Sequence, residues 1–454
     1  MITYSIIQKS QLEGALRLDA EYYQPEYLNL LQILMRRPHA SLKDLVERIS
    51  RGKQPIYKES GNILAFTSDQ IRNDFIDTST VRYTDEMFYK SNPKAQVRAL
   101  DVLLNSTGVG TLGRVNFYYL EEKAVVDSHI TIIRVIPERV NPIFLNVFLK
   151  TKYGQLQITR AYTGSSGQIE LYQEQIKEFL IFLPSPEEQS EIAEMVKQAI
   201  NLHTQSEFLY SQAEDLLLEE LGLKDFKIED DLSYIVNLSE IKSAHRADAE
   251  YFQPKYEKII SKIKCKIEKL ANLLLPKGGI RKGIEIGSEQ YQEEGKLFIR
   301  VSNLSKHGLV ERDQKYLSEE LYQKLKKDFE PKVGEILLTK DATPGIAYFL
   351  KEPVEGIIAG GILRLKLKSD INPEYLALVI NSIVGQIQVE RDTGGSVIFH
   401  WRPDQIKNLL IPILSKSTQQ KIADLVQKSY EARKKAKQLL EEAKRKVEKL
   451  IEDN

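Results

Sequence analysis

The chain of 454 residues carries 64 basic and 64 acidic side chains. Its formal net charge is therefore zero, and the overall charge neither supports nor excludes a polyanionic partner such as DNA. The only cysteine, Cys265, excludes an intramolecular disulfide and a cysteine-rich zinc site. No apolar run approaches the roughly 20 residues that a membrane helix needs. The N-terminal stretch also lacks the pattern of a signal peptide, so we expect a cytoplasmic protein without a membrane partner.

The first half of the chain opens with a short lead that ends in Arg17-Leu-Asp-Ala-Glu-Tyr-Tyr-Gln-Pro-Glu-Tyr27. Apolar residues then recur at the i, i+3, i+4, i+7 spacing of one helix face, at Tyr27, Leu30, Leu31 and Leu34. Short apolar runs between turn residues predict strands at 102–104, 125–126, 130–136 and 180–183. Residues 142–157 read as a helix with proline in its first turn.

A long helix closes this half. Its apolar and small residues step by three and four, as in the seam of a coiled coil: Ile192, Met195, Ala199, Leu202, Ser206, Leu209, Ala213 and Leu216.

The second half repeats the first in the same order. The signature returns 229 positions later as Arg246-Ala-Asp-Ala-Glu-Tyr-Phe-Gln-Pro-Lys-Tyr256, and an amphipathic helix follows it. Strands are predicted at 336–339, 356–358, 362–367 and 409–414, and a helix at 373–388. A second seam follows in the same register as the first: Ile422, Leu425, Ser429, Ala432, Ala436, Leu439 and Ala443.

This duplication predicts an α/β (α+β) protein with a pseudo-two-fold internal repeat. We expect two globular domains, at 1–185 and 223–415, and two long helices, at 186–222 and 416–454. Each seam could be buried against its own domain or against the other helix. The matching registers and the dense flanking charge favour two helices that pack together, and symmetry-related units would run them antiparallel.

The order of these elements resembles the specificity subunit of type I restriction-modification enzymes. The resemblance is carried by the two signatures, by Glu188-Gln-Ser-Glu-Ile-Ala193 and Gln420-Lys-Ile-Ala423, and by Leu297-Phe-Ile-Arg-Val-Ser-Asn-Leu304. It covers essentially the whole chain. It implies a non-catalytic subunit with two target-recognition domains, each of which reads half of an interrupted site in double-stranded DNA.

The same resemblance implies the partners. The long helices would act as spacer and docking surface for two methyltransferase (modification) subunits, and restriction motor-nuclease subunits would join them for cleavage. This chain would hold no cofactor and no metal, because S-adenosylmethionine, ATP and Mg are expected on the partner subunits.

The two halves differ most in their glycine-flanked basic loops. Ser50-Arg-Gly-Lys-Gln-Pro-Ile-Tyr57 does not resemble Pro276-Lys-Gly-Gly-Ile-Arg-Lys282, and 105–111 differs from 339–345. A shared scaffold with different loops predicts two different half-sites. Long cations in such loops can reach phosphates, and arginine can also read guanine. The predicted DNA contacts are Arg51, Lys53, Arg72, Arg114, Arg160, Lys277, Arg281, Lys282, Arg300, Lys340 and Arg391. The turns at 163–168 and 393–396 could also bind the DNA backbone.

Catalysis by this chain is not indicated. The chain has no phosphate-binding loop and no methyltransferase tetrapeptide. Asp101 with Glu121-Glu-Lys123 fits a loose nuclease pattern for which we find no equivalent in the second half. His129 and His400 occupy non-equivalent contexts, and neither is expected to sit beside a plausible nucleophile and an orienting acid. In the signatures, Arg17 and Asp19 suit an ion pair rather than acid–base chemistry. Besides DNA recognition, the main alternative function is a coiled-coil scaffold that never binds DNA. A third hypothesis is that the chain is itself a nuclease or a methyltransferase.

Overall fold

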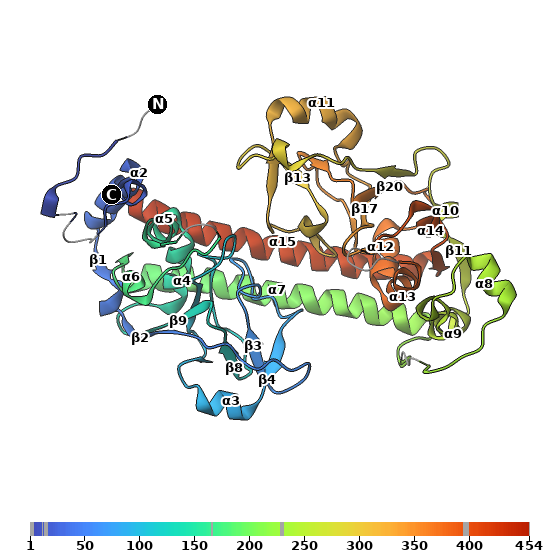
Figure 1. Cartoon of the computed structure of the whole chain (residues 1–454), viewed down its shortest axis with the longest axis horizontal. Coiled ribbons are helices and arrows are strands. Elements are labelled where there is room, and N and C mark those ends of the chain that lie inside the picture. The colour runs from blue at the N-terminus through green and yellow to red at the C-terminus, as the bar shows by residue number, and fades with distance from the viewer. Residues whose placement is uncertain are drawn as a thin grey trace. The chain divides into compact units, whose positions relative to one another are not determined.

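The computed structural model describes residues 4–10, 12, 17–164, 167–227, 231–393 and 399–453. The chain divides into two compact units. Unit 1 combines Met1–Thr204 with Arg433–Asn454, and unit 2 is Gln205–Ala432. Each unit therefore holds one globular domain and one half of each long helix (Figure 1). No helix among the described residues is long and apolar enough to cross a membrane.

The elements of the first domain follow the predicted order, with additional short strands. The helices are η1 (Ala20–Tyr23), α2 (Pro25–Met35), η2 (Leu42–Asp44), α3 (Glu86–Ser91), α4 (Pro142–Lys150), α5 (Lys152–Ala161) and α6 (Gln173–Lys177). The strands are β1 (His39–Ser41), β2 (Val46–Arg51), β3 (Ile63–Phe66), β4 (Arg82–Thr84), β5 (Gln96–Val97), β6 (Val102–Asn105), β7 (Val115–Phe117), β8 (Ala124–Val126), β9 (Ile130–Val135) and β10 (Leu180–Phe182).

The second domain repeats these elements. Its helices are α8 (Leu238–Ala244), η3 (Ala249–Phe252), α9 (Lys255–Lys262), α10 (Leu270–Leu273), η4 (Ser288–Gln290), η5 (Val301–Asn303), α11 (Glu319–Phe329), α12 (Pro373–Asn381), α13 (Ile383–Asp392) and α14 (Pro403–Lys407). Its strands are β11 (Lys266–Lys269), β12 (Ile280–Lys282), β13 (Lys296–Ile299), β14 (Leu304–Ser305), β15 (Gly308–Leu309), β16 (Lys315–Leu317), β17 (Ile336–Thr339), β18 (Ala347–Phe349), β19 (Gly356–Ile358), β20 (Ile362–Leu365) and β21 (Leu410–Ile413).

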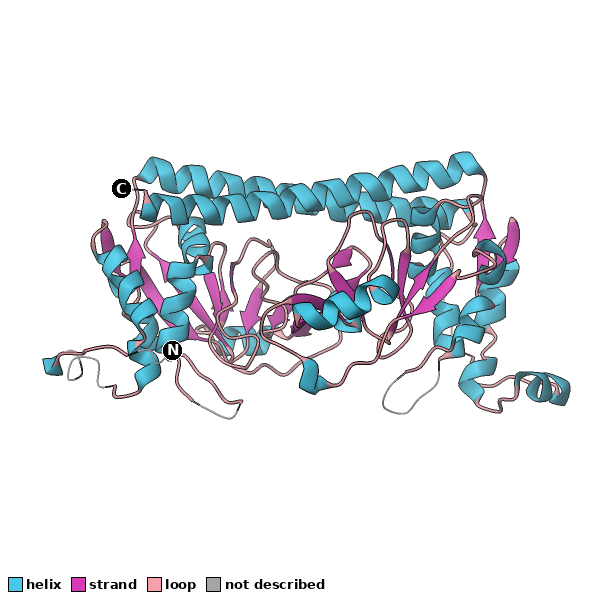
Figure 2. Ribbon diagram, turned by 90° about the horizontal axis from the view of Figure 1, so that it is seen from above, coloured by secondary structure: helices cyan, strands magenta, loops and turns pink. Residues whose placement is uncertain are grey.

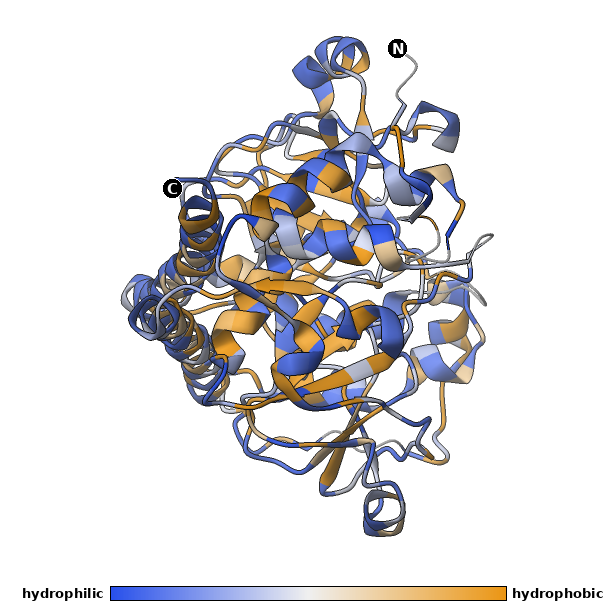
Figure 3. Ribbon diagram, turned by 90° about the vertical axis from the view of Figure 1, so that its left-hand side faces the viewer, coloured by the Kyte–Doolittle hydropathy of each residue, from blue (hydrophilic) through white to orange (hydrophobic). Residues whose placement is uncertain are grey.

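The two domains share the topology of their central sheet, while their second sheets differ in the number of strands. An antiparallel sheet of order β2-β9-β6-β7 in the first domain corresponds to β12-β20-β17-β18 in the second. A second sheet contains one parallel pair in each domain, β3 with β8 and β13 with β19. The central strands are buried on both faces, which explains their continuous apolar runs. In Figure 3, coloured by hydropathy, the strands carry mainly the hydrophobic colour.

The helix predicted at 142–157 is in fact two helices. Thr151 lies between α4 and α5 in an extended conformation, and its side chain accepts a hydrogen bond from the Gly154 amide. A Cβ on Gly154 would lie 2.5 Å from the Leu149 Cα, so only glycine permits so tight a turn. Ser382 and Gly385 occupy the same places between α12 and α13. The single helix predicted at 373–388 is wrong for the same reason.

The two long helices are α7 (Pro186–Glu220) and α15 (Lys416–Glu452), and they pack together antiparallel as predicted. In unit 1, Glu191 forms an ion pair with Lys446, while Ala199 shares an apolar cluster with Ala436. In unit 2, the hydroxyl of Ser206 lies 3.1 Å from that of Ser429. Figure 2 shows the two helices running alongside each other in each unit, with the strands to one side.

Each seam is buried against its own domain as well as against the other helix. In unit 1, Ile192 and Ala443 belong to one cluster with Phe144 of α4, and in unit 2 Ala213 and Ile422 belong to one cluster with Tyr375 of α12. The alternatives of mutual packing and domain packing are therefore both realised.

A glutamine at the start of each long helix connects it to its domain. The Gln189 side chain accepts a hydrogen bond from the Asn141 amide at 2.9 Å and donates one to the Pro184 carbonyl at 3.0 Å. Gln419 makes the equivalent bonds with Asn372 and Leu414. These bonds explain why the sequence repeats a glutamine at this position.

A loop of each domain also packs on the long helices. In unit 1, the Phe75 ring stacks on His203 of α7 with centroids 3.8 Å apart. In unit 2, Lys306 lies over the Tyr210 ring at 4.5 Å and pairs with Glu214 at 3.2 Å, both on α7. These contacts fix how each domain sits on the helices of its own unit.

Candidate nucleic-acid interface

Four chain segments meet at one end of the central sheet in the first domain. Arg51 ends β2, Ser106 and Thr107 follow β6, and His129 precedes β9. The Ser106 amide donates to the His129 carbonyl at 2.9 Å, and a β-bridge joins Thr107 to Glu170. We call Arg51, Ser106, Thr107, His129 and Glu170 the first strand-end cluster.

The second domain has a cluster with the same backbone. The Lys340 amide donates to the Gly361 carbonyl at 2.9 Å, and a β-bridge joins Asp341 to His400. Lys282 ends β12 as Arg51 ends β2. The second strand-end cluster is therefore Lys282, Lys340, Asp341, Gly361 and His400.

A glycine fixes the correspondence between Arg51 and Lys282. The amide of Gly52 donates to the Ile130 carbonyl at 3.0 Å, and that of Gly283 donates to the Ile362 carbonyl at 3.1 Å. These two glycines pass close to the ends of β8 and β19, respectively. Each basic loop therefore contains a basic residue followed by glycine, Arg51-Gly52 in the first half and Lys282-Gly283 in the second. Comparison of the sequences alone missed this match, because the alignment of the two loops becomes visible only from the pairing of their strands.

The first cluster is held by polar contacts between its side chains. Arg51 pairs with Glu170 through one guanidinium nitrogen, and its other terminal nitrogen donates to the Ser106 hydroxyl at 3.3 Å. The hydrogen bond from Arg51 holds the pKa of Glu170 below its ordinary value. The Thr107 hydroxyl lies 2.5 Å from Nδ1 of His129. The Arg51 guanidinium is thus oriented on one side while its side chain remains 26% exposed.

The second cluster uses different chemistry on the same scaffold. Asp341 pairs with Lys340 and lies 2.8 Å from Nδ1 of His400. Burial alone would raise the pKa of Asp341, but the hydrogen bonds from Lys340 and His400 together hold it below its ordinary value. The His400 side chain is 62% exposed. The interpretation that His400 lacks an orienting acid is therefore wrong. The sequence does not reveal this acid, because Asp341 is 59 residues away from His400 along the chain.

The structure brings some of the predicted DNA contacts to the clusters. Arg51, Lys282 and Lys340 belong to them, Lys53 follows Arg51 and is exposed, and Arg281 precedes Lys282 and is exposed. Lys277 lies in the exposed loop before β12. Thr107 and Asp341 lie in the loops 105–111 and 339–345, which the sequence comparison singled out. Glu170 and His400 were not predicted, and only the pairing of strands places them here.

Other predicted contacts lie elsewhere. Arg72 is 3.9 Å from Asp77, and Arg300 pairs with Asp313 at 2.8 Å. The carbonyl of Arg114 accepts the Asn105 amide, and the Arg114 side chain is half-buried. DNA contact by these residues stays a prediction. Residues 165, 166 and 394–398, which belong to the predicted backbone-binding turns or follow them, lie outside the described part of the chain.

Arg160 and Arg391 contact residues of the first and second signatures, respectively. The guanidinium groups of Arg17 and Arg160 both lie over the Tyr22 ring, 4.8 and 3.7 Å from its centroid. Burial lowers the pKa of Arg160. Arg17 also pairs with Asp19, donating from Nε at 2.7 Å, which confirms the predicted ion pair. DNA contact by Arg160 stays a prediction, but its cation already faces an aromatic ring.

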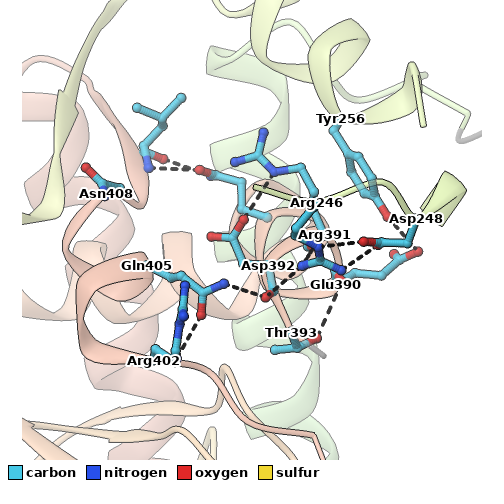
Figure 4. A network of polar contacts seen from close by, with 12 residues as sticks. Arg246, Asp248, Tyr256, Glu390, Arg391, Asp392, Thr393, Arg402, Gln405 and Asn408 are labelled. Carbon is cyan, nitrogen blue, oxygen red and sulfur yellow. Dashed lines mark hydrogen bonds and ion pairs between the residues drawn. The ribbon is translucent and has the colours of Figure 1, made fainter. Parts of the chain in front are cut away.

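The second signature repeats these contacts, because the guanidinium groups of Arg246 and Arg391 lie over the Tyr251 ring at 4.6 and 5.5 Å. Figure 4 shows the polar contacts that Arg246 and Asp248 make there. Arg246 pairs with Asp248 at 2.6 Å and donates to the carbonyl of Arg391 at 3.3 Å. The Gln405 amide donates to the Asp392 carbonyl at 2.7 Å. Arg246 and Gln405 therefore donate hydrogen bonds to carbonyls at the C-terminal end of α13, which would otherwise lack partners within the helix.

The carboxylate of the nuclease-like pattern is engaged within the first domain. Asp101 accepts two hydrogen bonds from the buried Arg134, at 2.8 and 2.6 Å. Glu335 holds the corresponding place before β17, so the second half does have an equivalent of this acid. Among the described residues, no group of three or more His, Cys, Asp or Glu side chains could hold a metal ion.

Comparison with known proteins gave one family. The model described as type I restriction modification DNA specificity domain matches residues 40–208 and 280–445. The fold is similar to a type I restriction-modification S subunit from M. genitalium, with 14% identity, coverage of 90% of this chain and 95% of that chain, and a TM-score of 0.43. It is also similar to an HsdS subunit from Thermoanaerobacter tengcongensis, with 13% identity, 91% and 95% coverage and a TM-score of 0.30. No curated protein matches the chain.

Proposed function

Because the chain belongs to the family of type I restriction-modification DNA specificity domains, we propose that its two domains read the two unlike parts of an asymmetric, interrupted DNA site. The observation that carries this proposal is the pair of strand-end clusters. The backbone is the same in both, whereas every side chain differs between equivalent positions. Different side chains on one scaffold are expected to prefer different bases.

The proposal includes the partners. The two equivalent units suit two copies of a methyltransferase subunit, and motor-nuclease subunits would complete the restriction complex. S-adenosylmethionine, ATP and Mg would then be held by those subunits. The engagement of Asp101 by Arg134 supports a non-catalytic role for this chain.

A scaffold that never binds DNA is the function this proposal must be tested against. In unit 2, Lys282 of the second strand-end cluster and the preceding Arg281 are both exposed. Replacing both with alanine removes two cations without opening a cavity. Lys421→Ala, on the exposed face of α15, is the matched control.

Binding of the full chain, and of its complex with the methyltransferase, to duplex DNA is measured at several salt concentrations. The double variant should bind more weakly to all sequences, and its salt slope should fall by about two, because each phosphate contact contributes about 0.9. Assembly with the methyltransferase should not change. The proposal is contradicted if the affinity of the wild type for DNA does not depend on salt. It is also contradicted if the double variant binds DNA as tightly as the Lys421→Ala control.

A further inference from the structure

Equivalent positions in the two clusters differ in how tightly the side chain is oriented. Arg51 is held by Glu170 and Ser106. Within the described part of the chain, its counterpart Lys282 has one ion-pair partner, Glu285, at 3.3 Å on an exposed loop. Glu170 and His400 occupy equivalent positions but act differently. Glu170 pairs with Arg51 in the first cluster, whereas His400 in the second cluster is itself held by Asp341. Within each cluster, a carboxylate of that same cluster holds one solvent-accessible nitrogen-bearing side chain: Glu170 holds Arg51, and Asp341 holds His400. Lys340 also pairs with Asp341 but is only 12% exposed.

Orientation matters because reading a base requires donors and acceptors at fixed positions. A lysine on a flexible stem can satisfy a phosphate from many positions, but discrimination between bases needs a group whose direction is set before binding. Arginine has five N–H donors. The contacts of Arg51 with Glu170 and Ser106 use two of these, and the remaining fork can still meet a guanine edge.

His400 is oriented by the same principle. When Nδ1–H donates to the Asp341 carboxylate, the ring presents Nε2 outward on a 62% exposed side chain. Lys340 holds the other oxygen of that carboxylate, so the acceptor cannot easily rotate away from His400. The imidazole edge is therefore set by two neighbours before any ligand arrives.

On the basis of the proposed function, we infer that Arg51 in the first unit and His400 in the second are specificity-determining residues, each reading one base of its half-site. Glu170 and Asp341 are positioning residues that act through them. Lys282, at the place of Arg51, contacts only phosphate.

The test is selection of bound molecules from a random-sequence duplex library by the full chain in complex with its methyltransferase. Arg51→Lys keeps the charge and should lose about 10- to 100-fold preference for one base pair in one half-site only. Glu170→Gln should weaken the preference at that same position. His400→Ala should relax one position in the other half-site, and Asp341→Asn should relax the same position.

Lys282→Ala is the matched control at the place equivalent to Arg51. It should weaken binding to every sequence and reduce the salt slope by about one, without changing the selected motif. Thermal unfolding of each variant shows whether its fold is intact, and Arg51→Lys is conservative enough to remain informative.

The outcomes separate the inference from the function on which it rests. A wild-type complex that selects no motif overturns both. A wild-type motif that Arg51→Lys and His400→Ala leave unchanged overturns the inference alone, and so does a Lys282→Ala motif altered at one base.

Discussion

Gly52 should tolerate no side chain, because the chain passes too close to the end of β8. A Cβ built on Gly52 would lie 2.2 Å from the Asp127 carbonyl oxygen and 2.3 Å from that of Val126. Real Cβ contacts below 3.0 Å essentially never occur. Gly52→Ala must therefore push two backbone segments apart by about 1 Å within a close-packed domain.

The magnitude follows from two effects. Overpacking of this kind costs about 1–3 kcal/mol. The shift also strains the hydrogen bonds from Gly52 to Ile130 and from Lys53 to Val126, at 3.0 and 3.1 Å, each worth about 0.5–1.5 kcal/mol. We expect Gly52→Ala to lower the free energy of unfolding by about 2–6 kcal/mol, measured by denaturant unfolding followed by circular dichroism.

The repeat supplies a matched test. Gly283→Ala should cost a similar amount, because its Cβ would lie 2.3 Å from the carbonyl oxygens of Ala359 and Ile358. Gly110 has a positive φ but nothing within 4 Å, so Gly110→Ala should cost only about 1 kcal/mol. If Gly52→Ala and Gly283→Ala both unfold like the wild type, the close approach of these glycines to the ends of β8 and β19 is refuted. If only one of them is destabilised, the equivalence of the two strand-end clusters is refuted.

Three further predictions concern the scaffold. Tyr251→Leu should lower the free energy of unfolding by about 1–2 kcal/mol, because it removes the ring over which the Arg246 and Arg391 guanidinium groups lie. A thermal melt unchanged from the wild type would show that these ring contacts do not stabilise the fold. The hydrogen bond from Arg17 lowers the pKa of Asp19 below 3.8, so the pair stabilises the fold at neutral pH and this contribution is lost as the pH falls through the lowered pKa. Asp19→Asn should therefore destabilise the protein at pH 7 but not at low pH, and equal destabilisation at both would contradict this account. Asp101→Asn should cost about 3–5 kcal/mol in denaturant unfolding because it leaves the buried Arg134 without its charge partner, whereas a loss below 1 kcal/mol would exclude that role.

The sequence predicted the elements that depend on long periodic patterns. Buried strands such as β9 and β20 have continuous apolar runs, and the seams of α7 and α15 repeat over many turns. By contrast, β2 was not predicted, because its burial is mixed and its side chains do not alternate clearly. The break at Thr151 was missed because a capping side chain and a glycine, rather than the apolar pattern, decide it.

The clusters were only partly predictable for a related reason. Basic residues next to glycine pointed to Arg51 and Lys282. The carboxylates that orient the exposed side chains are distant in sequence: Glu170 is 119 residues from Arg51, and Asp341 is 59 residues from His400. Strand pairing brings each carboxylate next to the side chain that it orients, and no local pattern in the sequence indicates this proximity.

The central claim is that one chain reads two unlike half-sites. It is tested most directly by mapping methylated bases in the genome of a host that carries this chain with its methyltransferase subunit. The account predicts methylation confined to a motif with two different specified parts separated by unspecified bases, and lost when the chain is deleted. A contiguous motif, two identical half-sites, or methylation that persists without the chain would contradict it.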